Sequence, residues 1–217
     1  MESCWEGIYQ QGNQLNRYPY DCVVSLVFGL LKSKPSLRVL ELGSGAGNHL
    51  VFLAENGVDA SGIELSSSAV AYSQAQLIQR NLSAEVVHGS FDNLPWPEDT
   101  FDLVIDRSAL NCAPRDIICH ALHEVNRVLK PGGEVFSQIY SQLHPAFLDA
   151  HTRHAGYACG FKHYFTDIDG LFFADKNDIA DLFSVFEELD FNHTVSYSKD
   201  NIVLNANWTV RVKKAMS

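Results

Sequence analysis

The sequence has few cations, no closely spaced cysteine pair and no long apolar run. Lys and Arg total 16 against 26 Asp and Glu, which gives a formal net charge of −10. A protein that binds the phosphate backbone of a nucleic acid needs a basic face, and no local cluster of Lys or Arg offsets this balance. We therefore expect no nucleic-acid partner. Because the sequence shows neither a bilayer-spanning stretch nor a signal peptide, we expect a cytoplasmic protein with no membrane partner.

The five cysteines are odd in number, are widely spaced and contain no C-x-x-C motif. This usage is typical of free thiols in a reducing compartment. A hydrophobic fraction of 46% and a charged fraction of 19% are ordinary for a globular protein. We expect one domain over 1–217, with an N-terminal arm at 1–19 and an irregular insert at 141–170.

Strand-like apolar runs alternate with helix-like periodic segments along most of the chain. The expected strands are 37–42, 58–63, 85–88, 101–105, 134–140, 191–198 and 202–212. The first expected helix begins at Pro19, and the second follows the first strand and ends at Asn56. Three more helices are expected at 66–81, 114–130 and 175–189. Alternation of this kind predicts an α/β fold with a parallel sheet. The short turn 199–201 allows only an antiparallel pair between the last two strands.

The stretch 39–50, VLELGSGAGNHL, is the one around which the chain is organised. A strand runs into Gly43, Gly45 and Gly47, and a helix follows at once, which predicts a small-molecule cradle at the first strand-to-helix turn. The nicotinamide fingerprint needs a third glycine where Asn48 stands. A P-loop needs a Lys and a Ser or Thr after its last glycine, and this turn has neither.

Glu41, two residues before the first glycine, completes an E-x-G-x-G-x-G pattern that resembles motif I of the class I S-adenosylmethionine (SAM)-dependent methyltransferases. The segments 122–133 (LHEVNRVLKPGG) and 94–97 (LPWP), the latter with Phe101 and Asp102, are typical of the small-molecule, type 11-like branch of that family. The resemblance implies a Rossmann-like, mostly parallel sheet of seven strands. Their order would be 3-2-1-4-5-7-6, with an antiparallel terminal hairpin and helices on both faces.

The resemblance also implies which residues bind the cofactor. Glu64, at the end of the second strand, would accept hydrogen bonds from both ribose hydroxyls. Leu65 and Phe91 would border the adenine, and Ser90 stands where the family usually has an adenine-binding Asp. The full set of expected cofactor-binding residues is Arg17, Tyr18, Glu41, Gly43, Ser44, Gly45, Gly47, Glu64, Leu65, Ser90, Phe91 and Asp106.

Two residues of the arm, Arg17 and Tyr18, suit the carboxylate and the sulfonium at the methionine end of the cofactor. An ordinary aromatic contact with the core explains them equally well. Asp106, at the end of the fourth strand, is a candidate to hold the methionine ammonium.

The insert 141–170 follows the fifth strand and is too long for a plain connection, so we expect it to cover the methyl acceptor. His144 is nearest the strand end and is the candidate general base, with Asp106 as the second candidate catalytic residue. The pair His151 and His154 lacks a third ligand, so no metal is expected.

These observations predict an enzyme that transfers a methyl group from SAM to an oxygen or nitrogen nucleophile of a small molecule by in-line displacement. S-adenosylhomocysteine (SAH) would be the product, and the protein would be a monomer or homodimer. A non-catalytic SAM-binding regulator remains an alternative, because motif I indicates binding and not turnover. A nicotinamide oxidoreductase is disfavoured by Asn48, and an aminopropyl transferase would need more acids than Asp106.

Overall fold

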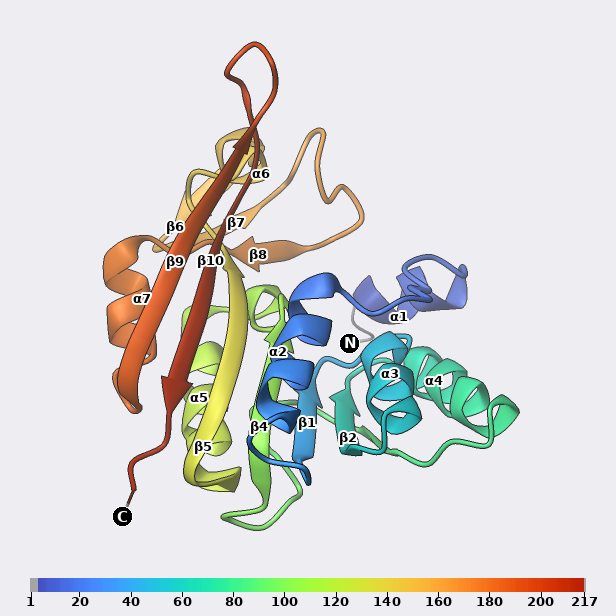
Figure 1. Ribbon diagram of the computed structural model, residues 1–217. Coiled ribbons are helices and arrows are strands. Elements are labelled where there is room, and N and C mark those ends of the chain that lie inside the picture. Colours follow the sequence, from blue (N-terminus) through green and yellow to red (C-terminus); the bar gives the residue numbers. More distant parts are fainter. Residues whose placement is uncertain (1–3, 217) are drawn as a thin grey trace.

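The computed structural model describes residues 4–216. Its main sheet has seven strands (Figure 1). In spatial order the strands are β3 (Glu85–His88), β2 (Asp59–Glu64), β1 (Arg38–Leu42), β4 (Phe101–Arg107), β5 (Leu129–Tyr140), β10 (Val203–Lys213) and β9 (Glu187–Tyr197). The pairs from β3 to β5 are parallel, and β10 is antiparallel to both of its neighbours. This order confirms the predicted 3-2-1-4-5-7-6 arrangement, because β10 and β9 are the last two strands of this sheet along the chain.

Helices cover both faces of the sheet (Figure 1). They are α1 (Cys4–Gln10), α2 (Asp21–Leu31), α3 (Asn48–Glu55), α4 (Ser67–Gln79), α5 (Arg115–Val128), α6 (Pro145–Asp149) and α7 (Lys176–Leu182), with a 3-10 turn η1 (Leu110–Cys112) after β4. Successive side chains of a strand point to opposite faces. Val39 packs with α2 and α3, whereas Leu40 packs with α5 and α7.

Local sequence signals set several of these boundaries. The Ser66 side chain accepts a hydrogen bond from the backbone N–H of Ala69 and caps α4, and Gly57, with φ +72°, ends the first crossover helix. The segment before β5 differs from the prediction, because β5 begins at Leu129 and not at 134. A Cβ on Gly133 would lie 2.8 Å from the carbonyl oxygen of Lys130, so the irregular stretch at the start of β5, where its register against β4 shifts, has room only for glycine at this position.

The predicted helix 175–189 is shorter than expected. It ends at Leu182, and β9 begins at Glu187. The apolar positions after Phe183 fit helix periodicity, but Phe186 packs into the core as the chain turns into the edge strand. Tertiary packing thus overrides the local pattern.

The insert is more regular than the sequence suggested. It contains α6 and a second, antiparallel sheet of β6 (Thr152–His154), β7 (Tyr157–Cys159) and β8 (Gly170–Phe172). This small sheet lies beyond the carboxyl ends of the main parallel strands, at the top of Figure 1. The small sheet and α6 share a buried apolar cluster that includes Phe173.

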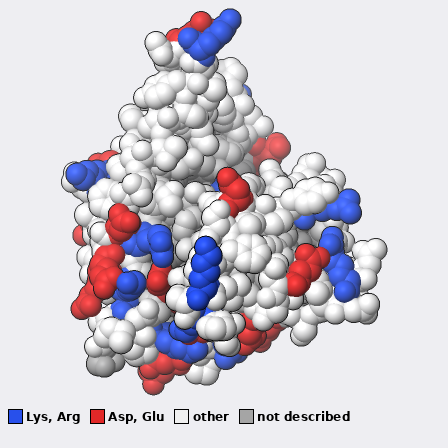
Figure 2. All heavy atoms as spheres, in the orientation of Figure 1, with Lys and Arg blue, Asp and Glu red and all other residues white. Residues whose placement is uncertain are grey.

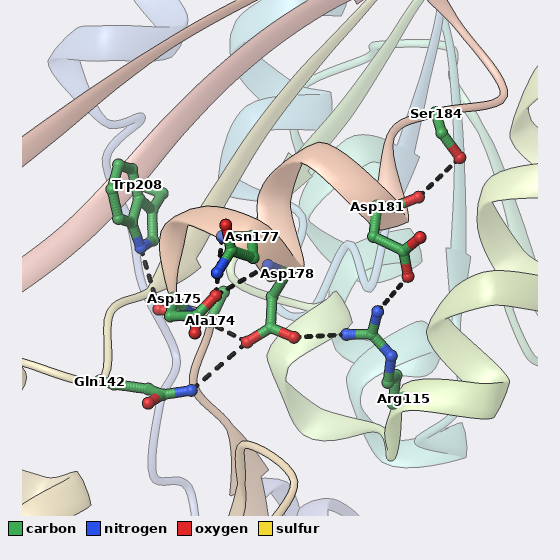
Figure 3. A network of polar contacts seen from close by, with 9 residues as sticks. All are labelled: Arg115, Gln142, Ala174, Asp175, Asn177, Asp178, Asp181, Ser184 and Trp208. Carbon is green, nitrogen blue, oxygen red and sulfur yellow. Dashed lines mark hydrogen bonds and ion pairs between the residues drawn. The ribbon is translucent and has the colours of Figure 1, made fainter.

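The two ends of the insert are tied together where it leaves and rejoins the main sheet. The Gln142 N–H donates to the Ala174 carbonyl, and the Ala174 N–H donates to the Tyr140 carbonyl. Figure 3 shows how α7 secures this junction: Asp178 accepts a hydrogen bond from the Gln142 side chain and forms an ion pair with Arg115 at the start of α5. The insert is therefore held at a fixed place over the strand ends.

On the face shown in Figure 2, the described Lys and Arg side chains are interspersed with acids and do not gather into a stripe. No helix of the described residues is long and apolar enough to cross a membrane.

Candidate functional site

A cavity of about 470 Å³ lies at the carboxyl ends of β1, β2, β4 and β5. This is the edge at which open α/β sheets bind their ligands. The volume falls within the range of roughly 300–1,000 Å³ typical of small-molecule sites. The glycine turn and the ends of β1 to β3 form one half of the cavity, and the ends of β4 and β5 together with the insert form the other.

The glycine turn contributes Gly43 and Gly45 to the cavity wall, with φ of +57° and +52°. A Cβ on Gly45 would lie 2.5 Å from the Tyr9 hydroxyl oxygen, and one on Gly43 would lie 2.5 Å from the Ala109 Cβ. Both positions therefore require glycine for conformation and for space. The structure thus leaves bare backbone facing the cavity at these two residues.

Gly47 lies where α3 and α4 meet. It does not line the cavity, and a Cβ there would lie 2.1 Å from the Ser73 Oγ of α4. Its glycine allows α3 and α4 to pack closely, and its contact with a cofactor stays a prediction.

Glu64 is buried at the end of β2 and also lines the cavity. Its two carboxylate oxygens accept hydrogen bonds from the backbone N–H of Gly45, at 2.9 Å, and of Ser66, at 2.8 Å. Burial raises the pKa of Glu64 above its ordinary value, and these backbone donors partly offset that effect. Glu64 therefore holds the glycine turn against the start of α4, and its remaining lone pairs are available to a ligand.

Glu41 forms a buried chain with His49 and Tyr20. The Tyr20 backbone N–H donates to His49 Nε2 at 3.2 Å, so the proton of the neutral ring lies on Nδ1, which is 2.5 Å from Glu41 Oε1. The other oxygen of Glu41, Oε2, is buried without a partner among the described residues, as is the Ser44 Oγ. Both side chains belong to residues of the cavity wall, so each leaves hydrogen-bonding capacity for a ligand there.

Leu65, Ser90 and Phe91 line the cavity beside β2 and β3, as predicted from their positions after these strands. The Gly89 N–H donates to the Glu64 carbonyl, which holds the two strand ends together. Leu65 is about half exposed and thus lies where a flat apolar group can rest on it.

Helix α1 closes the cavity from the N-terminal arm, with Trp5 and Tyr9 in its wall. The buried Glu6 carboxylate anchors the helix: it accepts hydrogen bonds from the Ser66 hydroxyl at 2.6 Å, the Ser68 hydroxyl at 2.5 Å and the Ser68 N–H at 3.2 Å. These donors belong to the start of α4, where a helix dipole favours a negative charge. They lower the pKa of Glu6 from 4.5 to about 2.

We expect Glu6→Gln to increase the amide hydrogen exchange of α1 by roughly tenfold at pH 7, because a carboxylate with charge-assisted hydrogen bonds is replaced by a neutral amide. A carboxyl whose folded pKa is depressed stabilises the fold above its unfolded pKa of 4.5 and loses that effect as the pH falls towards about 2. The difference between wild type and Glu6→Gln should therefore shrink below about pH 4.5. Asp116→Asn, an exposed acid at the start of α5, is the control; equal exchange in wild type and Glu6→Gln at pH 7 would disprove the anchor.

Comparison with known proteins agrees with this architecture. Residues 39–133 match the family model described as a methyltransferase domain. An uncharacterised methyltransferase of Synechocystis sp. is 34% identical over 103 residues, which cover 48% of this chain and 47% of that protein. The chain spans about half the length of the curated relatives it matches.

Two solved structures share the fold. A SAM-dependent methyltransferase from Methanosarcina mazei has a TM-score of 0.75 at 18% identity and aligns over 92% of this chain and 100% of its own. A didemethyltoxoflavin N-methyltransferase from Burkholderia thailandensis, solved with its acceptor and SAH, has a TM-score of 0.70 at 15% identity, over 96% and 84% of the two chains. The seven-stranded sheet of this chain has the Rossmann-like fold of the methyltransferases, and residues 39–133 are similar to their domain model.

The second half of the cavity is mainly aromatic. Tyr20 enters from the start of α2, Tyr140 from the end of β5, and Tyr157 and Phe165 from the insert. The Arg107 guanidinium lies over the Tyr20 ring, 4.2 Å from its centroid. The insert therefore does contribute to the cavity, but through its aromatic residues and not through its histidines.

Asp106 does not reach the cavity, so its role toward the methionine ammonium and in catalysis gains no support from its position and stays a prediction. Its side chain is fully buried and accepts hydrogen bonds from the N–H groups of Ala109 and Leu110 and from the Ser137 hydroxyl. Asp106 thus caps η1 and fastens it to β5.

His144, the predicted general base, is also placed away from the cavity, and its catalytic role stays a prediction. His144 is buried and lies among the rings of Tyr140, Phe165 and Phe173, and its Nδ1 accepts a hydrogen bond from the Ala146 N–H at the start of α6. Burial lowers its pKa from 6.5 to about 4, which keeps the ring neutral. It packs the core of the insert and does not line the cavity.

Arg17 and Tyr18 lie outside the cavity as well, so their contact with the methionine end stays a prediction. Tyr18 is 75% exposed, and both residues border a separate shallow depression beside α3. Within residues 4–216, no group of three His, Cys, Asp or Glu side chains is arranged to hold a metal ion.

Sequence reasoning missed Trp5, Tyr9 and His49 as wall residues, whereas Arg107, at a strand end, was a candidate for acceptor contact as much as for a surface charge. Trp5 and Tyr9 are one helical turn apart, which is a signal of a shared helix face. His49 lies two residues after Gly47, so its position makes it a candidate. The contact of Arg107 with Tyr20 joins residues far apart in the chain, and no local pattern pairs them.

Proposed function

We propose that this chain transfers a methyl group from SAM to a small-molecule acceptor, with SAM over the ends of β1 to β3 and the acceptor over those of β4 and β5. One observation carries the proposal: a single cavity joins an acid-bearing glycine turn to an aromatic chamber. A reaction that joins two ligands needs two adjacent binding sites of different chemistry.

The residues of the first half suit SAM. The unpartnered Glu41 Oε2 and Ser44 Oγ can bind hydrogen-bond donors, and Glu64 has lone pairs for the ribose hydroxyls. Gly43 and Gly45 leave room for the methionine end. Acids also suit a cofactor that carries a positive sulfonium and an ammonium.

Leu65 and Phe91 would flank the adenine, and Ser90 would bond its edge in place of the more usual acid. When bound, SAM supplies a methyl group already activated on a sulfonium sulfur. The protein is left to align the two ligands and to exclude water. Helix α1 and the insert, fixed at Glu6 and Gln142 respectively, supply that cover.

Calorimetry with SAM, SAH and NAD tests the cofactor assignment. We expect binding of SAM and SAH and none of NAD. Binding of NAD in preference to SAH would contradict the proposal. An acceptor screen that follows SAH release then tests turnover. SAH binding without turnover on any aromatic or heteroaromatic acceptor would favour a regulatory protein.

A further inference from the structure

Arg107 has no acidic partner among the described residues. None of the ion pairs within 4–216 includes it, although its side chain is half-buried. Its Nη1 donates to the Ser108 Oγ at 2.8 Å, and its Nε is buried without a partner. The neighbouring carboxylate of Asp106 is occupied by backbone N–H groups and Ser137. A partly buried cation with free donors is costly unless a ligand supplies the anion.

The surroundings of Arg107 are held in place. Tyr20 lies against the guanidinium, and its backbone N–H is fixed by the chain through His49 to Glu41. Ser108 adopts a left-handed backbone with φ +62°, which is strained for a residue with a side chain. This strained residue lines the cavity, and its Oγ accepts the hydrogen bond from Arg107.

The charges around the cavity favour the same location for an anion. Glu41 and Glu64 lie in the half beside β1 and β2 and repel a negative group. Asp169, the other acid of the wall, is exposed. Arg107 is the only Lys or Arg among the described wall residues. The space beside it is bounded by the rings of Tyr20, Tyr140, Tyr157 and Phe165, which favour a flat ligand.

We propose that the acceptor of this methyltransferase is a planar aromatic carboxylate, with Arg107 binding the carboxylate and the tyrosines enclosing the ring. This inference rests on the proposed function for the identity of the site. A carboxylate is fully ionised at neutral pH and matches the planar fork of a guanidinium. Arg107 acts as a specificity-determining residue and exchanges no proton with the ligand, since an arginine stays charged in a protein.

Three naphthalene probes of matched shape and different charge provide the test. Naphthoate, naphthamide and naphthylmethylammonium are titrated into the SAH-saturated full chain and followed by calorimetry. We expect naphthoate to bind at least about tenfold more tightly than naphthamide, and the cation to bind most weakly. Arg107→Gln should abolish the preference for naphthoate, and Arg107→Lys should retain part of it. SAH affinity should stay within about twofold in both variants.

Arg38→Gln is the matched control, because Arg38 also lies over an aromatic ring, that of Phe101, but at the opposite edge of the sheet. It should keep the full preference. Equal binding of naphthoate and naphthamide by the wild type overturns this inference without any variant. So does a parallel loss of SAH affinity in Arg107→Gln, which would place Arg107 on the cofactor carboxylate. A wild type that binds no SAH overturns the proposed function and this inference with it.

Discussion

Glu64→Ala is expected to weaken SAH binding by at least about a hundredfold. Two hydrogen bonds to a carboxylate, each worth about 1.5 kcal/mol or more, account for roughly 3 kcal/mol of binding free energy. The structure adds a second loss, because the same carboxylate fixes the Gly45 and Ser66 N–H groups. The substitution is thus expected to loosen the glycine turn and also to remove the carboxylate that accepts hydrogen bonds from the ligand.

The same substitution should lower the free energy of unfolding by roughly 2–4 kcal/mol, since two buried N–H groups lose their partner at about 1–3 kcal/mol each. Calorimetric titration with SAH and urea unfolding measure the two effects separately. Glu64→Gln should be intermediate in both, because its amide oxygen can still serve one N–H. Glu55→Ala, an exposed acid at the end of α3, controls for charge. Unchanged SAH affinity in a folded Glu64→Ala protein would remove Glu64 from the site.

The dual role of Glu64 illustrates how far the sequence determines the site. The carboxyl end of a parallel strand is a fixed place in an α/β sheet, so Glu64, Gly43 and Gly45 could be placed at the cavity from order and spacing. The hydrogen bond between Glu64 and Gly45 could not be predicted, because it depends on how the turn after β1 meets the start of α4.

Gly47 and Asp106 lie away from the cavity for two different reasons. The space beside Gly47 is filled by Ser73 of another helix, and no local pattern reports such a contact. For Asp106 a local signal existed. An aspartate that accepts from N–H groups three and four residues later forms a helix-cap pattern, and the residues after Asp106 permit that turn.

The positions of the arm and the insert could not be predicted from the sequence, for a third reason. Their positions depend on long-range contacts, such as Glu6 with Ser66 and Gln142 with Asp178. The insert places Tyr157 and Phe165 in the cavity wall, and its role as the cover of an acceptor stays a prediction. His144 packs inward, because a histidine near a strand end can fill a core as readily as it can face a ligand.

Asp106→Ala should be among the most destabilising single changes in this protein, at roughly 3–5 kcal/mol. The side chain is fully buried and has three hydrogen-bond donors around it, from Ala109, Leu110 and Ser137. Removing it leaves those donors without an acceptor, at about 1–3 kcal/mol each with partial relaxation. Urea unfolding at about pH 5, below the Asp106 pKa of about 6, measures the loss without the cost of a buried charge in the wild type. A free energy of unfolding close to that of the wild type would show that Asp106 does not hold η1 in place.

Asp106→Asn should instead raise the free energy of unfolding. Both backbone N–H groups donate to the same oxygen, Oδ1, and Ser137 bonds to the other, so an asparagine can accept twice through its carbonyl and donate to the Ser137 Oγ through its amide.

Burial raises the pKa of Asp106 from 3.8 to about 6. A carboxyl with a raised folded pKa favours the fold fully below its unfolded pKa and loses that contribution as the pH rises through 6. The wild type is therefore disfavoured above about pH 6 by a buried charge that Asp106→Asn does not carry. At about 1.4 kcal/mol for each unit of pKa, the variant should gain roughly 2–3 kcal/mol over the wild type between pH 4 and pH 7. Urea unfolding of both proteins across that range measures the gain. A difference that does not change with pH would mean that Asp106 is ionised in the folded protein at no cost, and that the hydrogen bonds around it outweigh its burial.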